Sequence, residues 1–216
     1  MKRKTILTMA LSCCMLAATA QVTIKDVLCN MPETIIPYIG EEQREEICKF
    51  TNETDTIKIK NELNDFTEVN LSGTDFALIK LNESATLQIK LLPMNDTAQI
   101  ICMAKTMTTP ISESNVKFYS TDWKPINDSF GLPQFPESES LAATFTQRPD
   151  TMPENKYEEL LGYFDPVTVY ADISKKDNVI TYSLGVPLAS KAEKNELKAI
   201  IKPKSYKWTG FNFKKV

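Results

Sequence analysis

The residues of this chain that could do acid–base chemistry are carboxylates, because the sequence contains no histidine. That absence excludes Ser-His-Asp and Cys-His machinery and removes the commonest zinc ligand. The six glycines form neither a G-x-G-x-x-G fingerprint nor a Walker loop, which excludes nucleotide binding by those two routes. We therefore expect no cofactor and no metal site.

Carboxylate pairs remain, and glycoside hydrolases work with two of them. The chain holds 28 acidic residues, so composition alone does not select a pair. Asp122, next to Trp123, and Asp165, ahead of Pro166 at a predicted helix-to-strand junction, are the candidates that their positions suggest. Turn and capping roles account for both aspartates more simply. A glycan hydrolase with a carboxylate pair is therefore the alternative function.

Aromatic residues near the ends of two predicted strands could bind a sugar or a protein partner by stacking. Aromatic side chains on strands usually belong to the core, but lysines flank both tryptophans and favour their partial exposure. The candidate binding residues are Trp123, Tyr119, Trp208 and Tyr206, with Phe211 and Phe213 beside the second pair.

Three cysteines, Cys29, Cys48 and Cys102, follow the N-terminal apolar segment. Their spacing contains no C-x-x-C pair, which argues against thiolate zinc sites and thioredoxin-like redox chemistry. An odd number leaves at least one thiol outside any intramolecular disulfide. A disulfide between Cys29 and Cys48 is one arrangement, but we expect three buried thiols, because free cysteine behaves as a small hydrophobic residue.

The first 20 residues have the three parts of an export signal: basic residues 2–4, an apolar stretch over 6–18 and a small-residue triplet at 18–20. Cleavage after Ala20 predicts a periplasmic or secreted protein. A lipoprotein anchored through Cys13 or Cys14 is the less favoured alternative, since Ala10 stands where such signals usually carry leucine. No later segment reaches the roughly 20 apolar residues that a transmembrane helix needs.

The charge of the chain is uneven along its length. Without residues 1–20 there are 22 basic and 28 acidic residues, a net charge of −6. This balance disfavours nucleic-acid binding. Positive charge gathers from Lys191 onward, where eight lysines stand against two glutamates.

Apolar spacing predicts two short helices over 23–50, interrupted by two prolines and a glycine. Alternating patterns separated by turn residues then predict an antiparallel β meander. A Pro-rich connection over 126–153 leads to a short helix over 155–164 and further strands, so the order suggests two helix-plus-meander halves, 21–125 and 154–216. We expect an α+β protein in which these halves could pack into one domain. The predicted strands span residues 66–71, 76–81, 85–92, 97–107, 116–121, 167–173, 179–184, 197–201 and 206–213.

The segment 26–50 carries MPETIIPY at 31–38 and ends its polar helix in ICKF at 47–50. It resembles the start of a family of exported Bacteroidales proteins known as domain of unknown function 3256. The resemblance continues through 87–92 to FY at 118–119 and DWK at 122–124. It implies a cell-envelope or secreted setting and supplies no activity, cofactor or catalytic residue.

The resemblance also implies exposure to the Bacteroidales pattern of glycan attachment at Asp-Ser/Thr followed by a small or aliphatic residue or methionine. DTI at 55–57, DTA at 96–98 and DTM at 150–152 fit that pattern. Thr56, Thr97 and Thr151 are therefore candidate glycosylation sites, although turn chemistry alone would also place Asp-Thr pairs in such segments.

We expect this chain to be a non-enzymatic binding or adaptor module of the cell envelope, with a protein or a glycan as its partner. A hydrolase should show a deep cleft that holds two acids roughly 5 to 10 Å apart. A binding module should instead show an exposed apolar or aromatic patch. The sequence does not determine the oligomeric state.

Overall fold

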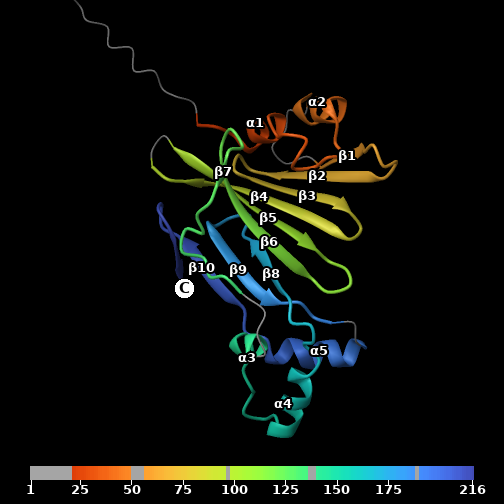
Figure 1. Cartoon of the computed structure of the whole chain (residues 1–216), viewed down its shortest axis with the longest axis vertical. Helices are drawn as coiled ribbons and strands as arrows, with labels where there is room; N and C mark the ends of the chain where they lie inside the picture. The colour runs from red at the N-terminus through yellow and green to blue at the C-terminus, as the bar shows by residue number, and fades with distance from the viewer. Residues whose placement is uncertain (1–20, 50–55, 96–97, 136–139, 188–189) are drawn as a thin grey trace, which may run out of the picture.

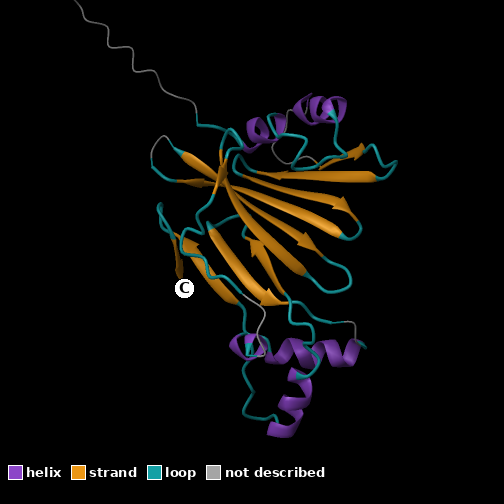
Figure 2. Ribbon diagram, in the orientation of Figure 1, coloured by secondary structure: helices purple, strands orange, loops and turns teal. Residues whose placement is uncertain are grey.

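The computed structural model of the chain describes residues 21–49, 56–95, 98–135, 140–187 and 190–216. Two antiparallel sheets with flanking helices form an α+β fold. Helices α1 and α2 lie on one side of the larger sheet, whereas the smaller sheet and the remaining helices lie on its other side (Figures 1 and 2). The predicted export signal, residues 1–20, lies outside the described residues.

The larger sheet has seven strands in chain order, each antiparallel to its neighbours, so the sheet is a meander. Its strands show period-two burial, as in β1, where exposed and buried residues alternate along five positions. The turn between β2 and β3 holds Gly73 at a φ of 68°, a left-handed conformation that glycine adopts without strain. The strands are β1 (Thr56–Lys60), β2 (Phe66–Ser72), β3 (Phe76–Asn82), β4 (Ala85–Pro93), β5 (Gln99–Met107), β6 (Glu113–Ser120) and β7 (Pro125–Ile126).

Two short helices, α1 (Ile24–Cys29) and α2 (Glu41–Lys49), cover one face of the larger sheet, where the sequence predicts two helices. Thr23 and Asp26 form a reciprocal capping box that satisfies backbone donors at the start of α1. The buried side chains of α1 pack with the inward residues of strands β1 to β5 in one continuous core. Burial of this apolar stripe holds helices that are too short to be stable alone.

The smaller sheet has four strands in the order β11-β10-β9-β8 and packs against the other face of the larger sheet. Its own helices cover its lower end in Figure 1 and share its core through residues such as Phe145, Leu160 and Leu197. These elements are α3 (Leu141–Thr144), α4 (Glu154–Leu161), β8 (Val169–Ile173), β9 (Val179–Leu184), α5 (Lys191–Ile200), β10 (Lys204–Trp208) and β11 (Phe213–Lys215).

The edge of the smaller sheet is satisfied by side chains of the larger one. Two outward N–H groups of β8 make these bonds. The Ala171 N–H donates to Ser114 Oγ at 2.8 Å, and the Ile173 N–H donates to Gln88 Oε1 at 2.9 Å. Bonds of this kind cover a strand edge that would otherwise expose unpaired backbone groups. They also fix the position of the smaller sheet on the larger.

A buried lysine makes a further tie between the sheets. The side chain of Lys90 on β4 is 1% exposed, and its Nζ lies 2.8 Å from Asp75 Oδ2. The same amino group donates to the backbone oxygen of Lys175, in the turn between β8 and β9, at 3.1 Å. Lys90 is therefore held by a carboxylate of the larger sheet and a carbonyl of the smaller one.

Two features of the predicted secondary structure are wrong in the second half of the chain. The predicted strand 197–201 is the end of helix α5, whose cap is a reciprocal Ser190–Glu193 capping box. The predicted strand 206–213 is two strands, β10 and β11, joined by a turn that contains Gly210 at a φ of 100°. Trp123, just beyond the predicted strand 116–121, lies in the turn after β6 at a φ of 62°.

The prediction of three free thiols is also wrong, because Cys29 and Cys48 form a disulfide. Packing of α1 beside α2 brings their Cα atoms to 5.5 Å, within the range that a disulfide spans. Replacing both residues by serine should lower the free energy of unfolding by about 3 kcal/mol, because the bond closes a loop of 19 residues' separation in the unfolded chain. Urea unfolding of the oxidised protein and of the double variant measures this difference. Equal stability of the two would contradict the prediction.

Cys102 is the buried free thiol of the part of the chain that the structure describes. Burial raises the pKa of this thiol, and burial likewise raises the pKa of the nearby Tyr182 phenol. We predict that iodoacetamide leaves Cys102 unmodified in the native protein and labels it after unfolding.

A pH dependence follows from the same two groups. Both folded-state pKa values lie above those of the unfolded chain, so the stability they contribute is complete below the unfolded pKa of roughly 8.5 for a thiol. It is lost as pH rises above that value, because the unfolded chain releases protons first. Urea midpoints measured between about pH 7 and about pH 10 should fall, and less steeply in Cys102→Ala. A flat profile in that range would contradict this assignment.

Candidate functional site

The aromatic residues proposed for binding are distributed between the two cores. Trp123 and Trp208 are each 5% exposed, so the prediction that they are partly exposed is wrong. The Trp123 indole donates to the Val27 backbone oxygen at 2.9 Å and tilts against Tyr119, which is also buried. Tyr206 is half-buried beside Tyr182. Each indole therefore acts as a tie between layers, with its N–H satisfied inside the protein.

The two aspartates proposed for catalysis lie in separate surface segments. Asp122 is exposed in the turn after β6 and accepts hydrogen bonds from the Lys124 amino group at 2.6 Å and from the Ser120 hydroxyl. Those bonds, that from Lys124 first, lower the pKa of Asp122, which is the opposite of what a general acid requires. Asp165 is exposed ahead of Pro166. Neither aspartate lines the large cavity described below.

The candidate glycosylation sites differ in what the structure describes. Thr56 begins strand β1 and is exposed, while Asp55 before it lies outside the described residues. Asp96 and Thr97 both lie outside them. Thr151 is exposed in the turn ahead of α4.

A cavity of about 740 Å³ lies between strand β6, the segment 127–135 and the beginning of β8. Its volume is in the range of pockets that hold small molecules. Residues of β6 with both odd and even numbers line it, from Glu113 to Tyr119. Because odd and even residues point to opposite faces of a strand, the cavity follows the edge of β6 and not one of its faces. The other lining residues are Pro125, Ile126, Asn127, Asp128, Ser129, Leu132, Pro133, Gln134, Phe135, Leu141, Pro166, Val167, Thr168, Val169 and Tyr182.

The pairing of β6 shows which of its backbone groups reach this edge. The Ser120 N–H bonds to the Lys124 oxygen on the β7 side, and the ladder between β5 and β6 has no register shift. In an antiparallel ladder the N–H and C=O of alternate residues point the same way. The even-numbered residues of β6 therefore direct their backbone groups away from β5, toward the cavity.

Both ends of that edge are covered. Strand β7 pairs with β6 only at Phe118 and Tyr119, after which the chain leaves the sheet. At the other end, the Thr168 hydroxyl donates to the Ser112 oxygen at 3.0 Å, and a Cβ placed on Gly185 would lie 2.5 Å from the same oxygen. The outward backbone groups of Ser114 and Val116 lie between these covers. No backbone group from the described parts of the chain bonds to them, and we call these two residues the edge window.

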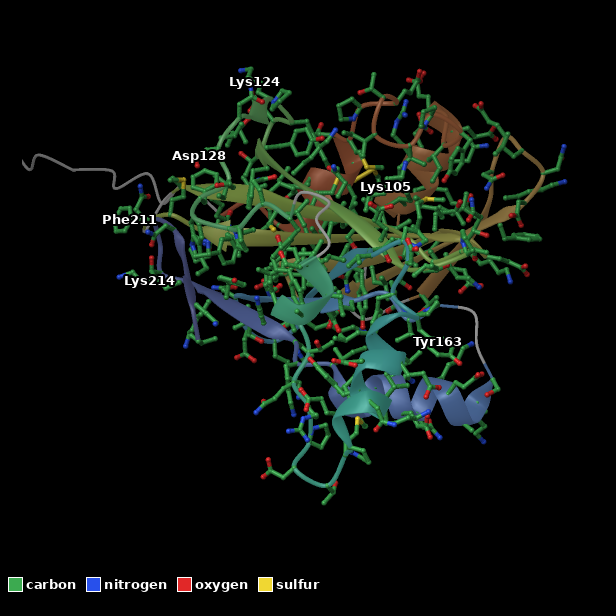
Figure 3. The ribbon with its side chains drawn as sticks, turned by 60° about the horizontal axis from the view of Figure 1, so that its bottom comes forward. Lys105, Lys124, Asp128, Tyr163, Phe211 and Lys214 are labelled. Atoms are coloured by element: carbon green, nitrogen blue, oxygen red, sulfur yellow. A yellow bond between two sulfur atoms is a disulfide. The ribbon has the colours of Figure 1, made fainter. Side chains whose placement is uncertain are left out.

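The two sides of the edge window differ in chemistry. The even-numbered side chains of β6 point toward the apolar core of the smaller sheet, together with Leu132, Phe135 and Leu141. The odd-numbered side of β6 carries exposed Glu113, Asn115 and Lys117. The register places exposed Lys105 of β5 directly beside Asn115. Figure 3 labels Lys105 on β5 and Asp128, which lines the cavity.

Other charged groups lie outside this cavity. Lys207 and Lys214 face each other across β10 and β11, as the basic C-terminal sequence suggests, and Phe211 and Lys214 mark this hairpin in Figure 3. Tyr163, labelled beside α5, donates to Glu193 at 2.9 Å. Among the residues that the structure describes, no group of three acidic or cysteine side chains could hold a metal ion. Within those residues, no helix is long and apolar enough to cross a membrane.

The sequence gives one signal for the edge window, the proline at the start of β7. Pro125 lacks a backbone donor, and proline in sheets is confined to edges and strand starts. It indicates that pairing on this side of β6 is brief. The walls of the cavity come from segments far apart in the chain, so their approach is not visible in the sequence.

Comparison with solved structures places the fold beside a domain of an uncharacterized protein from Porphyromonas gingivalis W83. That structure superposes with a TM-score of 0.68 at 21% sequence identity, over 89% of this chain and 96% of the other. The likeness concerns the fold alone. A comparison with curated proteins found no match. A family model described as "Protein of unknown function (DUF3256)" matches residues 15–213. This chain is therefore a member of the DUF3256 family, as its sequence motifs indicate.

Proposed function

We propose that this protein is an exported, non-enzymatic binding module whose ligand occupies the cavity beside β6. The observation that carries the proposal is a hollow with a mixed lining, which combines apolar residues such as Leu132 and Phe135 with polar ones such as Asn127 and Gln134. Ligand sites typically combine an apolar lining with a few convergent polar groups. The partner is a protein or a glycan of the cell envelope.

Export is supported by the covalent structure of the N-terminal layer. The Cys29–Cys48 disulfide joins α1 to α2, and disulfides persist mainly in oxidising compartments such as the periplasm and the extracellular space. Together with the signal-like residues 1–20, this favours a periplasmic or secreted protein.

A binding role is favoured over glycan hydrolysis by the carboxylates. The acidic residues that line the cavity, Glu113 and Asp128, are both exposed. A general acid for glycoside cleavage needs a carboxyl whose pKa is raised by a dry environment. An exposed carboxylate lacks that environment and suits hydrogen bonding to a ligand.

Filling the cavity tests the proposal. Gln134 is exposed and lines the cavity, so Gln134→Trp should occupy it with little effect on folding. The matched control is Asn195→Trp, on the exposed side of α5 and outside the cavity. Labelled wild type and both variants are applied to an array of soluble glycans and an array of short peptides. We expect signals that wild type and Asn195→Trp share and that Gln134→Trp loses. Signals that survive Gln134→Trp would overturn the assignment of this cavity, as would the absence of any signal on both arrays.

A further inference from the structure

We propose that the ligand of this cavity is an extended peptide that adds to strand β6 as an extra strand, through the backbone groups of Ser114 and Val116. This inference rests on the proposed binding function and selects its ligand class. The argument depends on the direction of the β6 backbone groups, on the covers at both ends of the edge and on the chemistry of the two sides.

Backbone groups are the first part of the argument. The edge window presents the N–H and C=O of Ser114 and Val116 to the cavity, and no backbone group of the described chain bonds to them. An array of alternating donors and acceptors with strand spacing is complementary to one partner above all, which is another extended backbone. A glycan has no such repeat.

The position of the window is the second part. Strand β7 already occupies the same edge at Phe118 and Tyr119, so an added peptide would continue the line that β7 begins. Thr168 and Gly185 close the edge at Ser112. The covers limit pairing to a short segment and guard against open-ended addition of strands.

The opposite edge of the same sheet, strand β1, has the features of an edge that is protected against pairing. Within the described residues, strand β1 pairs with β2 alone, and its Asn61 N–H bond to the Asp65 oxygen shows that the backbone groups of Lys58 and Lys60 point outward. Lysines on an edge are a common defence against pairing. No residue of β1 lines the cavity beside β6. The β6 edge, by contrast, lies along this cavity.

Side-chain chemistry is the third part, and it specifies the peptide. One side of an added strand would face Val116, Leu132 and Phe135, and so should carry apolar residues. The other side would face Lys117 and, one strand further, Lys105, and so should carry acidic residues beside these two lysines, while Glu113 stands at the far end of the same side. Within the described residues neither lysine has an ion-pair partner. The preferred ligand is therefore a peptide with alternating apolar and acidic residues.

The probe is a hexapeptide of alternating valine and glutamate with both ends blocked. Its binding to the full mature protein is measured by fluorescence anisotropy. Two control peptides have the same side chains but carry N-methyl groups on all valine nitrogens or on all glutamate nitrogens. In an added strand only one of these two sets faces β6, so one methylated peptide should lose binding and the other should retain it. Loss with the valine set would identify the antiparallel orientation.

A protein variant gives an independent reading. Val116→Pro removes an outward N–H and leaves the ladder with β5 intact, since proline is tolerated on edge strands. Lys60→Pro is the matched control at an outward position of the β1 edge. We expect Val116→Pro to lower the affinity for the peptide about tenfold, because one hydrogen bond is lost and its acceptor is left unpaired. Lys60→Pro should leave the affinity unchanged. Thermal unfolding checks that both variants fold, and the methylated peptides need no variant at all.

The outcomes separate this inference from the proposed function. Equal binding of the parent and both methylated peptides would overturn strand addition. Binding of an array glycan by the wild type that Gln134→Trp loses would also overturn strand addition, although the cavity would then remain a binding site. Self-association of the wild type that Val116→Pro abolishes would overturn the peptide in favour of a second copy. If Gln134→Trp retained all of the binding of the wild type, the cavity would not be the binding site, and the proposed function would be overturned as well.

Discussion

Trp208→Ala should lower the free energy of unfolding by about 4 kcal/mol, the largest single effect that we expect in this protein. The indole ring fills the space between Phe130 and Phe213, with ring centroids at 5.5 and 5.1 Å. Its N–H donates to the Pro93 oxygen at 2.6 Å, so the side chain joins β10 of the smaller sheet to the end of β4 in the larger. Alanine removes both the buried ring and the tie.

Trp208→Phe separates these two contributions. Phenylalanine retains most of the ring and loses the indole N–H, which leaves the Pro93 oxygen without this donor. We expect a cost of about 1 to 2 kcal/mol for this variant. Urea unfolding followed by far-UV circular dichroism measures all three proteins. An alanine variant no less stable than the phenylalanine variant would show that Trp208 is not a packing centre.

Asp75→Ala should lower the free energy of unfolding by about 3 kcal/mol, and more than Lys90→Met does. The reason is the unequal burial of the two partners. Lys90 has a side chain that is 1% exposed, whereas that of Asp75 is 42% exposed. Without Asp75 the buried ammonium keeps only the Lys175 oxygen and the nearby Phe76 ring. Without Lys90 the Asp75 carboxylate is solvated, and methionine fills the vacated space.

The double variant Asp75→Ala with Lys90→Met tests that reasoning. It should be more stable than Asp75→Ala alone, because no unpaired charge is left in the interior. Denaturant midpoints of the wild type, both single variants and the double variant complete the cycle. If Lys90→Met proved the more destabilising single change, the amino group would matter for its contact with Lys175 and not for its pairing with Asp75.

Much of the larger sheet follows from local sequence alone. Strands β2 to β6 and β9 lie close to their predicted ranges, because period-two alternation and turn residues such as Gly73 are local signals. The prediction of a strand over 197–201 is wrong because this short, mostly apolar segment fits either a strand or a helix. The Ser190–Glu193 capping box was the local signal that distinguishes them.

The exposure of a side chain on a strand depends on which face of the sheet it points to. Lys207, the neighbour of Trp208, favours exposure of the tryptophan if sequence neighbours share an environment. On a strand they do not, because Lys207 points away from the face that buries Trp208. The Cys29–Cys48 disulfide likewise depended on α1 packing beside α2, which no spacing rule specifies.

The sequence by itself determined the α+β composition, the meander, the absence of histidine-based chemistry and the membership of the family. Only the tertiary structure decided the candidate site. The edge window exists because β7 leaves β6 after two residues and because β8 and the segment 127–135 close around the gap. Those walls come from segments brought together by burial of a shared apolar core, a non-local and non-directional effect that leaves no motif in the chain.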